Sequence, residues 1–155
     1  MRPRIVTIYT DGACEPNPGP GGWAAILRYG TQETILTGAD ADTTNNRMEL
    51  QAAISALEEL RTSPPGPEPL RVELYTDSQY LQQGITAWLP KWIAHNWRKS
   101  DRQPVLNADL WQELHALAQQ RDIRWHWLRG HSGQRHNERA NRLANEAMRC
   151  GMHSS

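Results

Sequence analysis

Two acidic residues each end a segment that favours a β-strand. Asp11 follows residues 5–10 and Asp77 follows residues 72–76, and both segments are rich in β-branched and aromatic residues. Each acid has a local explanation when taken alone, because an Asp-Gly pair is typical of a turn and an aspartate at position 77 can cap the helix that follows it. Two strands that both end in an acid can bring their carboxylates to one edge of a sheet. The repeated pattern therefore predicts a carboxylate site.

Two further polar residues, Glu49 and Asn141, lie in predicted helices beside loops. Carboxylates that gather in one place repel one another and lose hydration unless a cation joins them. Oxygen ligands without cysteine or paired histidine favour Mg²⁺ or Mn²⁺. Glu49 also lies three residues after Asn46, so the acid of a helix capping box is an alternative role for it. The joint pattern of Asp11, Glu49, Asp77 and Asn141 is what favours a divalent-cation site.

The glycine-flanked segment 130–133 carries His131 just before the last predicted helix. The segment lacks the further glycine that a nucleophile elbow requires, because position 134 is Gln134. His126, His131 and His136 are five residues apart, without the helical spacing of a zinc motif. We therefore interpret His131 as a side chain that can swing in a loop, and His126 as a packed or surface residue on a strand.

Length and composition indicate one domain that works in a reducing compartment. The chain has 155 residues, 38% of them hydrophobic, and its mean hydropathy is −0.74. No apolar run approaches the roughly 20 residues that span a bilayer, and we expect no signal peptide before the first strand. Two cysteines far apart give no disulfide framework, so we expect a cytoplasmic protein without a membrane partner. The equal numbers of basic and acidic residues, 17 each, count mildly against a nucleic-acid binder, although the distribution of charge matters more than its sum.

The hydrophobic periodicity predicts five strands and five helices in the order β-β-β-α-β-α-α-α-β-α. The strands are expected at residues 5–11, 23–29, 33–37, 70–75 and 123–128, and the helices between residues 46–62, 79–88, 91–99, 109–118 and 137–148. Glycine and proline in segment 14–22 are expected to prevent regular structure, and Pro90 to break a helix. Residues 1–3 and 150–155 are expected to be flexible ends. Tight turns between the early strands and helices between the later ones predict an α/β fold, a mixed five-stranded sheet with helices on both faces.

Several segments resemble those of bacterial type 1 ribonuclease H (ribonuclease HI). They are residues 10–14 with 17–19, 44–50, 76–80, 130–133 and 137–140, and they occur in the order found in the family. The resemblance runs from about residue 5 to residue 148 and implies a ribonuclease H-like fold for the single domain, residues 1–155. It also implies a monomeric endonuclease that cleaves the RNA strand of RNA–DNA hybrids and leaves 5′-phosphate and 3′-hydroxyl ends.

The resemblance further implies a cofactor, because the family uses two divalent ions held by four carboxylates. Such ions, Mg²⁺ or Mn²⁺ as a substitute, lie roughly 3.5–4 Å apart. On this basis Asp11 bridges both ions, while Glu49 and Asp77 complete the cluster. His131 matches the family's histidine, which is thought to assist proton transfer or product release.

The family's fourth acid falls at Asn141. Asparagine keeps a carbonyl oxygen but carries no charge, so the site has three formal negative charges in place of four. We expect the second ion to bind more weakly and the activity to be reduced. The alternative is a catalytically inactive module of the same fold that only binds hybrids.

The same resemblance implies a set of substrate-binding residues. RNA differs from DNA by its 2′-hydroxyls, which are read across a shallow minor groove. The matching residues are Cys14, Asn17, Asn45, Asn46 and Gln79 for the groove, and Thr44 and Asn107 for a phosphate of the DNA strand. The alternative for these asparagines and threonine is an ordinary role in turns and helix caps.

The family's basic protrusion matches residues 88–102, which carry Trp88, Lys91, Trp92, Arg98, Lys99 and Arg102. Trp88 and Trp92 are expected to pack together as i,i+4 neighbours, or one of them to contact a sugar.

Overall fold

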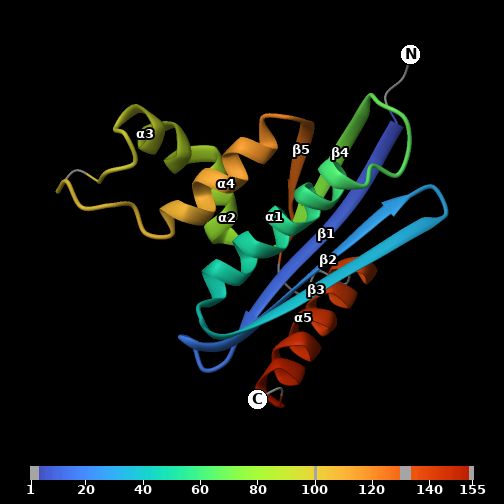
Figure 1. Cartoon of the computed structure of the whole chain (residues 1–155), viewed down its shortest axis with the longest axis horizontal. Helices are drawn as coiled ribbons and strands as arrows, with labels where there is room; N and C mark the ends of the chain where they lie inside the picture. Colours follow the sequence, from blue (N-terminus) through green and yellow to red (C-terminus); the bar gives the residue numbers. More distant parts are fainter. Residues whose placement is uncertain (1–3, 100, 130–133, 154–155) are drawn as a thin grey trace.

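The computed structural model describes residues 4–99, 101–129 and 134–153, in which five strands form one sheet (Figure 1). The strands are β1 (Arg4–Cys14), β2 (Gly19–Tyr29), β3 (Gln32–Thr43), β4 (Leu70–Thr76) and β5 (Asp122–Trp127). Their order is β3-β2-β1-β4-β5, so β1 is central. β2 pairs antiparallel with β1 and β3, whereas β4 is parallel to β1 and to β5. This arrangement confirms the predicted mixed sheet.

Helices cover both faces of the sheet, as predicted. They are α1 (Asn45–Thr62), α2 (Gln79–Gln83), the π-helical turn η1 (Gly84–Trp88), α3 (Leu89–Ala94), α4 (Ala108–Ala118) and α5 (Arg135–His153). Successive residues of β1 point to opposite faces: Ile8 packs in the core with Leu50 of α1, and Tyr9 packs with Ala140 of α5. Asp11 has the parity of Tyr9, so its side chain is on the α5 side. α5 packs against β1, β2 and β3, and Figure 1 shows it on the side of the sheet opposite to α1.

The glycine-rich segment after β1 is more regular than the sequence predicts. Only residues 15–18 bend between two strands, and β2 already begins at Gly19. A side chain at Gly22 would place its Cβ 2.4 Å from the backbone oxygen of Ala144, so glycine lets α5 pack directly on β2. β1 and β3 likewise continue beyond their predicted ends at residues 11 and 37 because they pair with this extended β2.

The prediction that Pro90 breaks a helix is wrong. A helical path runs from α2 through η1 into α3, and Pro90 lies in the first turn of α3, where its missing N–H is not needed. The Leu89 N–H donates to the Gly84 carbonyl, which is the wider π-type pairing that precedes the proline. The predicted helix over residues 91–99 instead ends at Ala94, and Trp97 has a positive φ of 63°.

The last helix is longer than predicted. α5 begins at Arg135 and ends at His153, so residues 150–153, expected to be frayed, are helical. Contacts of α5 with β1, β2 and β3 hold this helix along the sheet. Within the described ranges, no helix combines the length and apolar character needed to cross a membrane.

Candidate metal centre and nucleic-acid interface

Three carboxylates meet at the edge of the sheet where β1 and β4 end. Asp11 lies on β1, Glu49 in the first turns of α1, and Asp77 directly after β4. Each offers an oxygen within 4.8 Å of the others' oxygens. Asp11 and Glu49 are 3% and 4% exposed, and Asp77 is half-buried. The parallel pairing of β1 with β4 brings together the two strand-end acids that the sequence suggested.

Neither helix uses one of these acids as its cap. The Thr44 hydroxyl caps α1 by accepting from the Arg47 N–H at 3.2 Å, and the Ser78 hydroxyl caps α2 by accepting from the Leu81 N–H at 3.1 Å. The capping roles considered for Glu49 and Asp77 are therefore filled by other residues. α1 also approaches β1 closely, because a Cβ at Gly12 would lie 2.6 Å from the Glu49 nitrogen.

The three acids are held in an electrostatically unfavourable arrangement. Burial, and then the neighbouring Asp77 charge, raises the pKa of Asp11 from 3.8 to about 6. Burial, followed by the charges of Asp11 and Asp77, raises the pKa of Glu49 well above its ordinary value. The Glu49 Oε2 atom is buried and has no hydrogen-bond partner among the described residues. Buried hard oxygens without a partner fit a divalent cation, which would supply the missing positive charge.

Asn141 of α5 reaches the same cluster. Its Nδ2 donates to Asp11 Oδ2 at 3.0 Å, while the Gly12 N–H donates to Asp11 Oδ1 at 2.8 Å. Both hydrogen bonds stabilise the ionised form of Asp11 and so oppose the rise in its pKa. The structure therefore joins four of the five predicted catalytic residues, and His131 lies outside the described residues.

Two cavities flank Asp77. One of about 270 Å³ is lined by Asp77, Asn137, Glu138, Asn141 and Arg142. The other, of about 440 Å³, is lined by Asp77, Ser78, Gln79, Gln82, Trp127, Leu128 and Arg129. Sequence reasoning missed Asn137, Arg142, Trp127 and Arg129 as site neighbours. Of these four residues, Asn137 could have been identified from the sequence, because it lies one helical turn before Asn141.

The predicted groove-reading residues gather beside the acids. The Asn45 N–H at the start of α1 donates to Asn17 Oδ1 at 3.1 Å, which joins the bend before β2 to that helix. The Cys14 Sγ lies 3.6 Å from the Thr43 carbonyl oxygen, one residue before Thr44. Asn46 is in the first turn of α1, and Gln79 lines the larger cavity beside Asp77. These contacts bring loop, strand and helix residues to one region.

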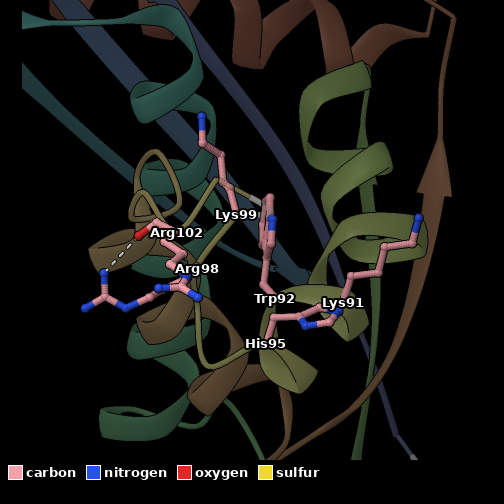
Figure 2. Close-up of a pocket in the computed structure, with 6 residues that line it drawn as sticks. All are labelled: Lys91, Trp92, His95, Arg98, Lys99 and Arg102. Atoms are coloured by element: carbon pink, nitrogen blue, oxygen red, sulfur yellow. Dashed lines mark hydrogen bonds between the residues drawn. The ribbon is translucent and has the colours of Figure 1, made fainter.

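The predicted basic protrusion forms a pocket of about 770 Å³. It is lined by Lys91, Trp92, His95, Arg98, Lys99 and Arg102, a set without an acid (Figure 2). The Arg98 Nη1 donates to the Arg102 carbonyl at 3.2 Å. The rings of Trp88 and Trp92 are 5.8 Å apart, which confirms that they pack together. His95 is the lining residue that the sequence did not suggest.

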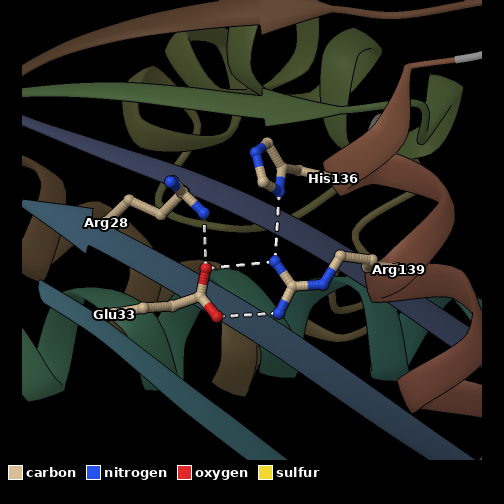
Figure 3. Close-up of polar contacts among 4 residues, drawn as sticks. All are labelled: Arg28, Glu33, His136 and Arg139. Atoms are coloured by element: carbon tan, nitrogen blue, oxygen red, sulfur yellow. Dashed lines mark hydrogen bonds and ion pairs between the residues drawn. The ribbon is translucent and has the colours of Figure 1, made fainter. Parts of the chain in front are cut away.

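A second polar cluster lies elsewhere on the α5 side (Figure 3). Arg139 contacts both carboxylate oxygens of Glu33 at 2.7 and 3.0 Å, and Arg28 also pairs with Glu33. His136 Nδ1 lies 3.1 Å from Arg139 Nη1. The hydrogen bond from Arg139 lowers the pKa of Glu33 to about 2. The cluster ties α5 to β2 and β3.

We predict that the metal-free protein loses stability as the pH rises from 5 to 7.5. The pKa of Asp11 is raised to about 6, so its contribution is fully present below about 3.8 and is lost as the pH passes 6. The full loss, from below pH 3.8 to well above pH 6, is about 3 kcal/mol, and about 1.4 kcal/mol of it falls between pH 5 and pH 7.5. The lowered pKa of His136 gives the opposite trend, because stability falls as the pH drops below 6.5. Urea unfolding in a chelator should therefore be compared with the Asp11→Asn variant, which retains His136. Equal pH profiles for the two proteins would contradict the prediction.

Comparisons with known proteins agree with these features. The family model described as RNase H matches residues 3–149. A ribonuclease H of Bradyrhizobium diazoefficiens is 54% identical over 144 residues, which cover 93% of this chain and 90% of the relative. One of Nitrosococcus oceani is 56% identical over 147 residues, covering 95% and 96%.

Solved structures with the same fold are also similar. LC9-RNase H1, described as a type 1 RNase H with the type 2 active-site motif, has a TM-score of 0.82 and 31% identity over 96% of this chain and 74% of its own. LC11-RNase H1, solved in complex with an RNA/DNA hybrid, has a TM-score of 0.72 at 22% identity and covers 95% and 99% of the two chains. At that identity the likeness concerns the fold.

Proposed function

Because this chain belongs to the RNase H family and is an endoribonuclease, we propose that it cleaves the RNA strand of RNA–DNA hybrids at the cluster of Asp11, Glu49 and Asp77. The convergence of these carboxylates, with Glu49 Oε2 buried and unpartnered among the described residues, carries the proposal. All three acids come from one chain, so the cluster needs no second subunit, and we propose that the enzyme is a monomer.

The same residues would hold two divalent ions, Mg²⁺ or Mn²⁺. Such ions supply a nucleophile by lowering the pKa of bound water and stabilise charge on the leaving oxygen. Asp11, on the central strand, would bridge them, and the backbone N–H of Gly12 fixes one of its oxygens. Asp77 is the most accessible of the three acids and faces both cavities. We propose that His131 assists proton transfer or product release.

The proposed substrate path runs from the acids to the protrusion. Cys14, Asn17, Asn45, Asn46 and Gln79 read the minor groove, Thr44 and Asn107 contact a DNA phosphate, and the basic residues with Trp88 and Trp92 follow the hybrid. The closeness of Asn17 to Asn45 and the acid-free lining of the basic pocket support this path. A hybrid carries its charge on phosphates, so a pocket of cations fits it.

A second candidate function is hybrid binding without catalysis. The observation that favours it is the Asn141 amide, which donates to Asp11 in place of supplying a fourth carboxylate. An assay of a labelled hybrid with Mg²⁺, with Mn²⁺ and with a chelator separates the two candidates. Metal-dependent release of 5′-phosphate RNA fragments supports the enzyme, whereas binding without cleavage in either metal supports the module.

We predict that hybrid binding weakens with salt along a shallow slope. Each neutralised phosphate contributes about 0.7–0.9 to the log–log slope, and we expect about three to five contacts in total. The reason is that few cations line the protrusion, namely Lys91, Arg98, Lys99 and Arg102. Lys99→Ala should lower the slope by about one contact. Arg61→Ala, in the last turn of α1, serves as the control. A slope of ten or more contacts would contradict this prediction.

A further inference from the structure

Arg47 connects the helix that carries Glu49 to α4. Its Nη1 and Nη2 atoms donate to the two carboxylate oxygens of Asp109 at 3.1 and 2.9 Å. The same Nη1 donates to Asn107 Oδ1 at 3.1 Å. α1 and α4 pack against each other (Figure 1). One guanidinium therefore fixes both the acid in the first turn of α4 and the asparagine that precedes this helix.

Asn107 is held without acting as a side-chain cap. It precedes α4 in the left-handed conformation, with φ 60°, and its side chain makes no capping hydrogen bond. Its Nδ2 donates instead to the Tyr80 hydroxyl oxygen at 3.1 Å, and the Trp111 Nε1 donates to that same oxygen at 3.0 Å. An amide nitrogen has two hydrogens, and among the described residues the Asn107 Nδ2 has Tyr80 as its acceptor, so its second N–H can bind a ligand.

The orientation of this amide depends on Arg47. A tyrosine hydroxyl can both donate and accept, so Tyr80 would tolerate either end of the amide. A guanidinium only donates, so it must face Oδ1 and thereby turns Nδ2 and its second hydrogen away from itself. Asp109 in turn anchors the guanidinium with a two-point contact.

We propose that Arg47 is a positioning residue, anchored by Asp109, that orients the Asn107 amide so that its remaining N–H can bind a phosphate of the DNA strand. This inference rests on the proposed function, in which Asn107 contacts that phosphate. Arg47 acts through Asn107 and does not itself contact the substrate. Lysine is a poor replacement because one ammonium group cannot reproduce the planar fork that contacts Asp109 and Asn107 together.

Two variants separate positioning from direct binding. For each variant, the Kd for a labelled hybrid is measured in Ca²⁺ by fluorescence anisotropy. Asp109→Asn weakens the anchor yet removes one negative charge from the protein. A positioning role therefore predicts weaker binding, by about threefold or more, whereas direct phosphate binding by a released Arg47 predicts tighter binding. Asp109 is 64% exposed at its side chain, so this variant should fold. Arg47→Lys keeps the charge and should weaken binding about three- to tenfold.

A double-mutant cycle tests the route through Asn107. If Arg47 acts only by orienting the amide, then Arg47→Lys should add no further loss of affinity once Asn107→Ala has removed that amide. In cleavage assays Arg47→Lys should raise KM and leave kcat unchanged. Glu33→Gln is the matched control, because it breaks the arginine–carboxylate cluster of Figure 3 and should leave the Kd within twofold.

The outcomes distinguish this inference from the function on which it rests. Failure of the parent chain to bind hybrid would overturn both. If the parent binds, unchanged or tighter binding by Asp109→Asn would overturn the positioning role alone. Fully additive losses for Arg47→Lys and Asn107→Ala would overturn it as well, since they would mean that the two residues act independently.

Discussion

We expect the Asp11→Asn variant to lose hybrid cleavage by at least about 10³-fold, the upper range for removal of one preorganised electrostatic group. Asp11 is the acid on the central strand, and both its oxygens face groups of the site: the Gly12 N–H and the Asn141 amide. An amide at this position would keep one oxygen but lose the charge that the proposed pair of cations shares. The measurement is single-turnover cleavage of a labelled hybrid in saturating Mg²⁺.

The variant should remain folded, and this separates loss of chemistry from loss of structure. Because burial raises the pKa of Asp11 to about 6, a neutral amide should make the metal-free protein more stable at pH 7.5. Asp122→Asn is a matched control, since Asp122 pairs with Arg71 on the surface of β5 and should be dispensable for cleavage. Activity of Asp11→Asn within about tenfold of the parent would show that the catalytic assignment is wrong.

The Asn141→Asp variant should have the opposite effect, with faster cleavage and a lower Mg²⁺ concentration at half-maximal rate. The Asn141 Nδ2 lies 3.0 Å from Asp11 Oδ2, so an aspartate would place a fourth carboxylate against the first. The added Coulomb attraction between a dication and one carboxylate about 4 Å away is on the order of 8 kcal/mol at an effective dielectric of about 20. The second of the two proposed ions should gain most, because it would have fewer protein ligands.

The same substitution should destabilise the metal-free protein at neutral pH, because two carboxylates would then face each other without the amide hydrogen. Hybrid affinity in Ca²⁺ should change little, since the proposed groove contacts lie on Asn17, Asn45 and Gln79. Asn145→Asp provides the control: it adds the same charge one turn further along α5, where Asn145 donates to the Asn141 carbonyl at 2.9 Å. Superimposable Mg²⁺ titrations of parent and Asn141→Asp would mean that the amide serves as well as the acid.

The local sequence pattern was sufficient to predict that two of the acids lie close together, because each of them ends a strand that can be recognised from its residues. Asp11 and Asp77 each end a strand of β-branched and aromatic residues, and parallel strands place their carboxyl ends at one sheet edge. The capping alternatives for Glu49 and Asp77 could be decided only in three dimensions. Thr44 and Ser78 each have a hydroxyl that accepts from the correct backbone N–H.

Local pattern failed where packing competes with backbone preference. Pro90 was expected to end a helix, yet the π-type pairing of Leu89 with Gly84 lets the helical path continue into α3. The glycines at the start of β2 were expected to prevent regular structure. They form strand because α5 approaches so closely that a side chain at Gly22 would clash with Ala144.

The sequence by itself determined the order of the elements, the mixed sheet and the three acids that meet in one cluster. Strand periodicity and the family's motifs depend on residues that are close together in the sequence. Only the tertiary structure decided that the Asn141 amide donates to Asp11 and that Arg47 reaches Asn107 and Asp109. The residues of these three pairs are separated in the sequence by 130, 60 and 62 positions, respectively. No local preference specifies such pairs, since their geometry depends on how α1, α4 and α5 pack against the sheet and against one another.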